Sequence, residues 1–206
     1  MSLCFYYWNR NPDIGHAELS LRVLRGLSSS YKKSEIFLIY SSPYESLLPE
    51  LRRYAGVLRL DPSKKADNPS RVLSFLRNKD IRLFVTEFFP MGREEAWSEI
   101  LPVVSALKER GAKILSLNPL PYFVHPAAKT GELLSSAALY DKILIHAPVR
   151  DLEYFSKSVV REKRISRAGF LRIFRSLKSK IYLGSFVIIV DIFWDSAIRN
   201  ADESSA

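Results

Sequence analysis

Short apolar runs alternate with segments of helical periodicity along roughly the first 150 residues. The apolar runs, which we predict to be strands, lie at residues 3–8, 35–40, 56–60, 81–86, 112–117 and 142–146. Apolar positions between them recur at the 3.6-residue spacing of helices. Strands that alternate with helices are typical of a parallel sheet buried on both faces. We therefore predict an α/β fold with an open, mainly parallel, Rossmann-like sheet and helices on both faces.

Glycine and proline residues mark several of the predicted helix ends. Gly15 precedes a helix over residues 16–27, and Pro43 is placed at the start of a helix running to about Tyr54. Asn68 and Pro69 open a third helix. A fourth, over about residues 94–110, is predicted to end at Gly111, since glycine adopts the backbone conformation that ends helices without steric cost.

The pattern changes after Asp151, where basic residues become frequent. The formal net charge of the chain is +9, and residues 156–180 carry nine basic residues and one acid, a net charge of +8. Aromatic and aliphatic residues alternate with arginine and lysine there, as in a basic amphipathic helix. Residues 181–194 are apolar but shorter than a membrane span and interrupted by Asp191, so we expect a terminal strand or an interface segment. We predict a domain over residues 1–155 and a tail over residues 156–206.

Several classes of site are not indicated by the sequence. Cys4 is the single cysteine, so no disulfide framework is expected, and its place in an apolar run favours a small buried side chain. We find no metal-ligand spacing, no phosphate-binding glycine loop and no nucleophile–histidine–acid arrangement. The first residues do not resemble a signal peptide, so we expect a cytoplasmic protein, peripheral at the membrane if the basic tail binds there.

Candidate site residues follow the predicted strands, because ligands of open parallel sheets gather at the carboxyl ends of the strands. Gly15 and His16 begin a helix, whose N-terminus favours an anion, and His16 is either a general base or an ordinary histidine. Glu87 either accepts hydrogen bonds from sugar hydroxyls or serves as a cap or partner for Arg93. Arg93 either holds a phosphate or is solvated. Asn118 follows a later strand, with a weaker signal.

Three segments resemble one enzyme family. The segment DIGHAELSLRVLRGL, residues 13–27, is similar to the first loop and helix of GT-B type glycosyltransferases related to the peptidoglycan N-acetylglucosaminyltransferase. The segment TEFFPMGRE, residues 86–94, with Leu101 and Pro102, resembles a loop and helix of that group, and YDKILIH, residues 140–146, resembles one of its strands. Residues 165–171 are similar to the segment that leads into the family's second domain.

The resemblance implies an acceptor-binding N-terminal domain. In this family a second Rossmann-like domain binds the nucleotide-sugar donor, and we expect that domain to be absent here, so transfer requires a separate donor domain or subunit. The donor is expected as a substrate, and no cofactor or metal is implied. We assign catalytic roles to His16 and Glu87. The substrate-binding candidates are Gly15, Gly92, Arg93, Asn118 and His146.

Two other classes of function remain open from the sequence. One is a non-catalytic binding module whose site has drifted, and the other is a nucleic-acid-associated protein that uses the basic tail. The nearly neutral body argues against the second. The basic tail instead favours an anionic lipid-linked acceptor or an anionic membrane surface as partner, besides a donor-binding glycosyltransferase subunit. In the remaining alternative, the basic residues of the tail only form a helix face that is exposed to solvent.

Overall fold

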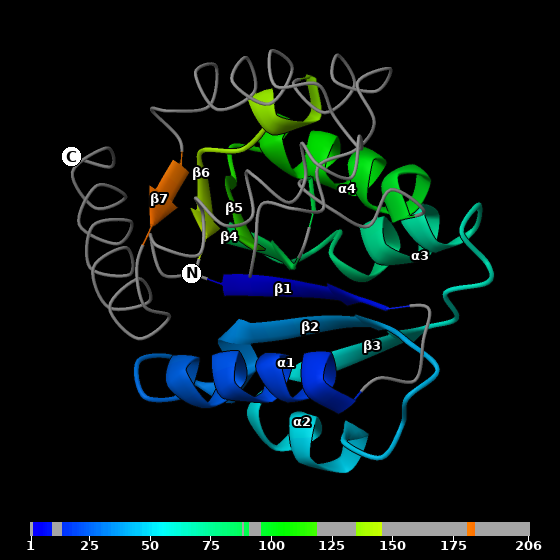
Figure 1. Cartoon of the computed structure of the whole chain (residues 1–206), viewed down its shortest axis with the longest axis vertical. Coiled ribbons are helices and arrows are strands. Elements are labelled where there is room, and N and C mark those ends of the chain that lie inside the picture. Colours follow the sequence, from blue (N-terminus) through cyan, green and yellow to red (C-terminus); the bar gives the residue numbers. More distant parts are fainter. Residues whose placement is uncertain are drawn as a thin grey trace, which may run out of the picture.

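The chain folds around a seven-stranded, entirely parallel sheet, which confirms the predicted open Rossmann-like α/β architecture (Figure 1). The structure is a computed structural model and describes residues 2–9, 14–87, 89–90, 96–118, 135–145 and 181–183. The strands lie in the order β3-β2-β1-β4-β5-β6-β7. Their bounds are Ser2–Trp8 (β1), Ile36–Ser41 (β2), Gly56–Leu60 (β3), Ile81–Glu87 (β4), Lys113–Asn118 (β5), Lys142–Ile145 (β6) and Ile181–Leu183 (β7).

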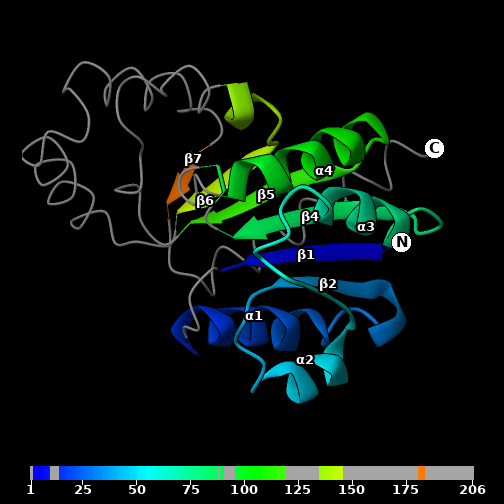
Figure 2. The same ribbon diagram turned by 90° about the vertical axis from the view of Figure 1, so that its right-hand side faces the viewer.

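Helices cover both faces of the sheet in pairs. Helices α1 (Ile14–Leu27) and α2 (Leu48–Tyr54) lie on one face, and α3 (Asn68–Phe75) and α4 (Trp97–Glu109) lie on the other (Figure 2). A short 3-10 helix, η1 (Lys33–Glu35), precedes β2. The sheet is therefore the middle of three layers, as its nearly continuous apolar strands require.

The central strand β1 supplies side chains to two separate halves of the core. Cys4, Tyr6 and Trp8 pack toward α3 and α4, whereas the alternate residues of the strand pack toward α1 and α2. All these side chains are buried, since β1 has a neighbouring strand on each side and helices on both faces. Burial raises the pKa of the Cys4 thiol, which accords with a packing role for this cysteine.

The structure corrects the predicted start of one helix. Pro43 does not begin α2, because the Tyr44 N–H donates instead to the Ser42 hydroxyl oxygen at 3.2 Å and the chain turns before the helix. The helix begins at Leu48, with Pro49 as the proline of its first turn. The preference of proline for the first turn of a helix therefore holds for α2, but the proline in that turn is Pro49 and not Pro43 as predicted.

The predicted end of α4 is confirmed. Gly111 has a φ of 84°, the left-handed conformation in which glycine is favoured. Its N–H donates to the Lys108 carbonyl at 2.9 Å, and the Ala112 N–H donates to the Leu107 carbonyl at 3.0 Å. These two bonds form a Schellman motif, which satisfies carbonyls at the helix end. Helix α4 begins at Trp97, which is later than the predicted start near residue 94.

The predicted tail contributes a strand to the sheet. Within it, β7 pairs in parallel with β6, Leu144 lying opposite Tyr182. The rest of residues 156–206 lies outside the described residues, so the boundary near residue 155 and the amphipathic helix stay predictions. In the described part of the chain, every helix is too short or too polar to cross a membrane.

Candidate functional site

The strand order creates one topological switch point, between β1 and β4. The helix that follows β1, α1, lies on one face of the sheet, and the helix that follows β4, α4, lies on the other, so the chain order reverses between these neighbouring strands (Figure 2). Ligands of doubly wound sheets bind beside such a point, outside the carboxyl ends of the strands. This edge of the sheet is therefore the candidate site.

Buried polar residues end the two strands that flank the switch point. Glu87 is the last residue of β4 and is fully buried, and Asn9 follows β1 and is 1% exposed. The Asn9 N–H donates to the Ser41 carbonyl at 2.8 Å, which extends the pairing of β1 with β2 by one residue. A buried carboxylate is stable only with polar or charged neighbours, because removing a charge from water is costly. Glu87 places such a buried carboxyl group at this edge of the sheet.

A cation lies beside the end of β1. The Lys65 ammonium is 5.4 Å from the centroid of the Trp8 ring, within the range of a cation–π interaction. Lys65 comes from the segment between β3 and α3, whereas Trp8 is the last residue of β1 and is fully buried. The arrangement holds a positive charge close to the switch point, where it favours an anionic group of a ligand.

Hydroxyl groups anchor the chain just after β4. The Phe89 carbonyl, next to a cis bond to Pro90, accepts hydrogen bonds from Thr86 Oγ1 at 2.9 Å and from Ser116 Oγ. Thr86 Oγ1 is also 2.8 Å from the Tyr140 hydroxyl oxygen. Since the single Thr86 hydroxyl proton points to Phe89, Tyr140 is the donor to Thr86. Burial raises the pKa of Tyr140 well above its usual value, which keeps that donor protonated.

A second buried carboxylate lies on the face of the sheet that α3 and α4 cover. Glu99, in the first turn of α4, accepts hydrogen bonds from the Tyr6 hydroxyl and from Asn68 Nδ2, the latter at 2.9 Å. Asn68 Nδ2 also donates to the Asp61 carbonyl at 2.7 Å. Burial and the Glu99 carboxylate raise the pKa of Tyr6 well above 10.0. This Glu99 cluster (Tyr6, Asn68 and Glu99) joins α3 and α4 to the central strand.

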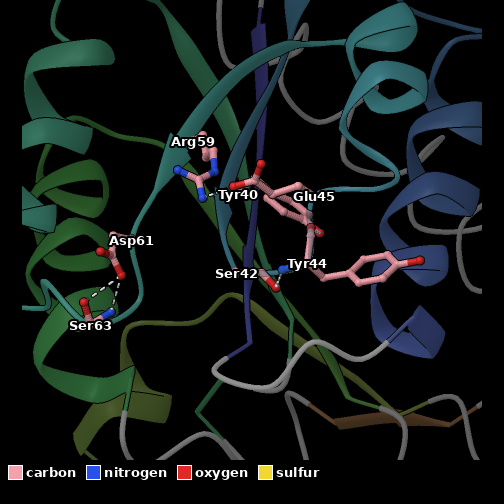
Figure 3. A network of polar contacts seen from close by, with 7 residues as sticks. All are labelled: Tyr40, Ser42, Tyr44, Glu45, Arg59, Asp61 and Ser63. Carbon is pink, nitrogen blue, oxygen red and sulfur yellow. Dashed lines mark hydrogen bonds and ion pairs between the residues drawn. The ribbon is translucent and has the colours of Figure 1, made fainter.

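Polar contacts also order the chain after β2 and β3 (Figure 3). The Tyr40 hydroxyl donates to the Tyr44 carbonyl, and burial raises the pKa of Tyr40 to about 12. Farther along this edge, Asp61 Oδ1 accepts from the Ser63 N–H at 2.9 Å and from the Ser63 hydroxyl at 2.7 Å. These two bonds lower the pKa of Asp61. The two turns therefore have defined shapes next to the candidate site.

The structure places four of the seven predicted site residues at this edge. Glu87 ends β4, Asn118 ends the neighbouring β5, and Gly15 and His16 are the second and third residues of α1, which starts from the same edge. For the last three, the structure describes only the backbone. Gly92, Arg93 and His146 lie outside the described residues.

Other residues of the edge were not predicted from the sequence. The sequence predicts Trp8 only as part of the strand over residues 3–8, and it gives no role to Asn9. Lys65 lies in a polar segment without a recognisable motif, and its position over Trp8 depends on the packing of β3 against β2. Glu99 had one detectable signal, since it is an acid on the apolar side of a helix, between Trp97 and Ile100.

The fold and this edge define the class of protein as a doubly wound α/β domain with buried polar residues beside its switch point. No model of a known protein family and no curated protein sequence matches the chain. Within the described ranges, no three histidine, cysteine or acidic side chains lie close enough together to hold a metal ion.

Proposed function

We propose that the chain is the acceptor-binding domain or subunit of a glycosyltransferase, which works with a separate domain or partner that binds the nucleotide-sugar donor. The observation that carries the proposal is the buried Glu87 carboxylate at the end of β4, beside the switch point. Glu87 also lies in the segment of residues 86–94 that resembles the glycosyltransferase loop. Fold alone does not establish an activity, whereas a carboxylate at the ligand edge of the sheet can bind the hydroxyl groups of an acceptor.

The chemistry of Glu87 suits a sugar acceptor. An ionised carboxylate accepts hydrogen bonds from hydroxyl groups, and these are stronger than bonds between neutral groups. In glycosyl transfer the acceptor hydroxyl gives up its proton, its oxygen attacks the anomeric carbon of the donor, and the nucleoside diphosphate leaves. Glu87 or His16 receives that proton, since both belong to the residue types that act as general bases.

The same edge offers two features for an anionic part of the acceptor. The N-terminus of α1, a 14-residue helix, favours negative charge through its dipole and through first-turn N–H groups that have no partner within the helix. Lys65 holds an ammonium group over Trp8 beside the end of β1. A sugar linked to a lipid through phosphate or pyrophosphate has hydroxyls for Glu87 and negative charge for these two features.

Binding to soluble acceptor analogues tests the proposal. The full chain is titrated with short-chain polyprenyl pyrophosphate-linked sugars and, separately, with nucleotide-sugars. We expect saturable binding of the first class, weakened about tenfold or more by Glu87→Gln, the loss of one charge-assisted hydrogen bond. Glu109→Gln, an exposed acid on α4, is the matched control and should bind as the unaltered chain does.

Three results would separate the proposal from its alternatives. Binding of nucleotide-sugars with comparable affinity would place the donor here and contradict an acceptor role. Binding of acceptor analogues without transfer, even beside a donor-binding partner, would favour a non-catalytic module. Equal affinity of Glu87→Gln and the unaltered chain would remove the residue on which the proposal depends.

A further inference from the structure

A concave surface lies at the opposite edge of the sheet from Glu87, on the α1–α2 side. It is a hollow of about 540 Å³ lined by the turn after α1, by the start of η1 and by the end of α2. This places it where α1 ends and β2 begins, at the amino ends of the strands (Figure 1). The lining residues, which we call the basic hollow, are Ser28, Ser29, Ser30, Tyr31, Lys32, Lys33, Arg53 and Tyr54.

The lining of the basic hollow contains three cations and no acid. Lys32, Lys33 and Arg53 are exposed, and within the described part of the chain none of the three forms an ion pair. Glu35 is the nearest acid along the chain, and its carboxylate already accepts a hydrogen bond from the Lys32 N–H at 2.9 Å. The positive charge of the hollow is therefore concentrated and only partly offset.

The cations are not needed to neutralise the end of α1. Helix C-termini expose carbonyl groups that attract positive charge. Here, however, the Ser28 hydroxyl donates to the Arg25 carbonyl and the Ser29 hydroxyl to the Gly26 carbonyl, each at 2.7 Å. The Leu27 carbonyl accepts from the backbone N–H groups of Ser30 and Tyr31. These bonds satisfy the helix end without the lysines.

Other basic side chains on the α1–α2 side form ion pairs, in contrast to the three cations of the hollow, which have no acidic partner among the described residues. Arg25, one turn before the hollow, pairs with Glu50 of α2, and Arg22 pairs with Glu18 within α1. An acid is therefore supplied to neighbouring arginines but not to the three cations that converge on the hollow. Like charges at close range repel each other, so their convergence is stabilised when an anion binds between them.

We infer that the basic hollow binds a phosphate-bearing ligand. Lysine and arginine are the side chains that hold phosphate, and arginine does so in a two-pronged geometry. The volume exceeds that of a phosphate alone, and the half-buried Tyr31 and Tyr54 provide flat surfaces for the organic part. The shared chemistry is a phosphate on a small polar carrier, either a soluble molecule or the headgroup of a lipid. This inference is independent of the acceptor site at the other edge.

A charge-matched pair of variants tests the inference. The test variant is Lys32→Gln, Lys33→Gln and Arg53→Gln together. The control is Arg71→Gln, Arg77→Gln and Arg110→Gln, which removes the same charge from exposed positions on the α3–α4 side. Both variants keep the basic residues of the tail, so differences between them report on the hollow.

In the first arm, pyrophosphate is titrated into the full chain at low salt while the amide signals of residues 28–33 are followed by NMR. We expect saturable shifts. The test variant should bind about tenfold more weakly, because each exposed ion pair contributes a factor of about two to three, whereas the control should change less than twofold. Equal weakening in both variants, or shifts that never saturate, would overturn the inference.

In the second arm, the same proteins are sedimented with vesicles of phosphatidylglycerol or of phosphatidylcholine. A selective loss of sedimentation with phosphatidylglycerol in the test variant identifies a lipid headgroup as the source of the phosphate. Equal sedimentation of test and control, together with selective loss of pyrophosphate binding, identifies a soluble phosphorylated molecule. If the test variant bound pyrophosphate and sedimented with vesicles as the unaltered chain does, the inference would again be overturned.

Discussion

Removal of one hydroxyl from the Glu99 cluster should destabilise the protein measurably. Tyr6→Phe keeps the ring in the core but deletes the donor to the Glu99 carboxylate, which is fully buried and then has only Asn68 as a donor among the described residues. Hydrogen bonds to charged groups contribute about 1.5–3 kcal/mol, and a buried acceptor left short of donors adds to the loss. We expect the free energy of unfolding to fall by about 2–3 kcal/mol.

Urea unfolding measures this loss, with the slope of the free energy against urea expected to stay unchanged. The control is Tyr44→Phe, since no partner of the Tyr44 hydroxyl occurs within the described ranges, and it should cost less than about 0.5 kcal/mol. Equal effects of the two substitutions would refute the reasoning.

A double-mutant cycle separates the charge from the hydrogen bond. In a Glu99→Gln background the Tyr6 hydroxyl faces a neutral amide, and its loss should cost only about 1 kcal/mol. The difference from the loss in the unaltered protein, about 1–2 kcal/mol, is the coupling between the Tyr6 donor and the Glu99 charge. A coupling energy near zero would mean that the Glu99 charge is balanced by other groups and that Tyr6 acts through packing.

The free energy of unfolding should fall steeply above pH 10, because tyrosines of the unfolded chain ionise there while the buried Tyr6, Tyr40 and Tyr140 keep their protons. Denaturation at graded pH should show full stability below pH 10. Above pH 10, each tyrosine should contribute a loss of about 1.4 kcal/mol per pH unit. Gly111→Ala should lower stability by about 1 kcal/mol in urea unfolding, since its left-handed φ disfavours a side chain although the surrounding space is open. The purified chain should transfer no sugar from nucleotide-sugars; turnover without a partner would refute the need for a separate donor domain. Neutralising four basic residues of the 156–180 segment should reduce sedimentation with anionic vesicles, whereas truncation would also remove β7.

Strands β1 to β6 were predictable because each is a short, mostly apolar run, as is typical of strands with helices on both faces. For β7, the sequence left a strand and an interface segment open. The rules of chain connection limit the possible orders of the strands in the sheet, but they do not fix a single order. The start of α2 was misplaced since two prolines, Pro43 and Pro49, are both compatible with a first helical turn. The choice between them depends on the Ser42 hydroxyl, which stabilises a turn at Tyr44.

The candidate site was predictable in position rather than in detail. The rule that ligands meet parallel strands at their carboxyl ends pointed to Glu87 and Asn118, and the structure places both there. The contacts of Lys65 with Trp8 and of Glu99 with Tyr6 join segments far apart in the chain. Sequence spacing does not reveal such contacts, because they depend on which strands become neighbours.

The two proposed ligand surfaces are far enough apart to be tested separately. A six-residue strand at about 3.3 Å per residue separates the carboxyl edge from the amino edge by roughly 20 Å. The Debye length at physiological ionic strength is about 8 Å, so the charge of the basic hollow is largely screened at Glu87. Neutralising Lys32, Lys33 and Arg53 should therefore leave the affinity for acceptor analogues unchanged, and Glu87→Gln should leave pyrophosphate binding unchanged. If both affinities fell together in a variant that unfolds normally in urea, the two edges would have to be energetically coupled, because direct electrostatics at this distance is too weak.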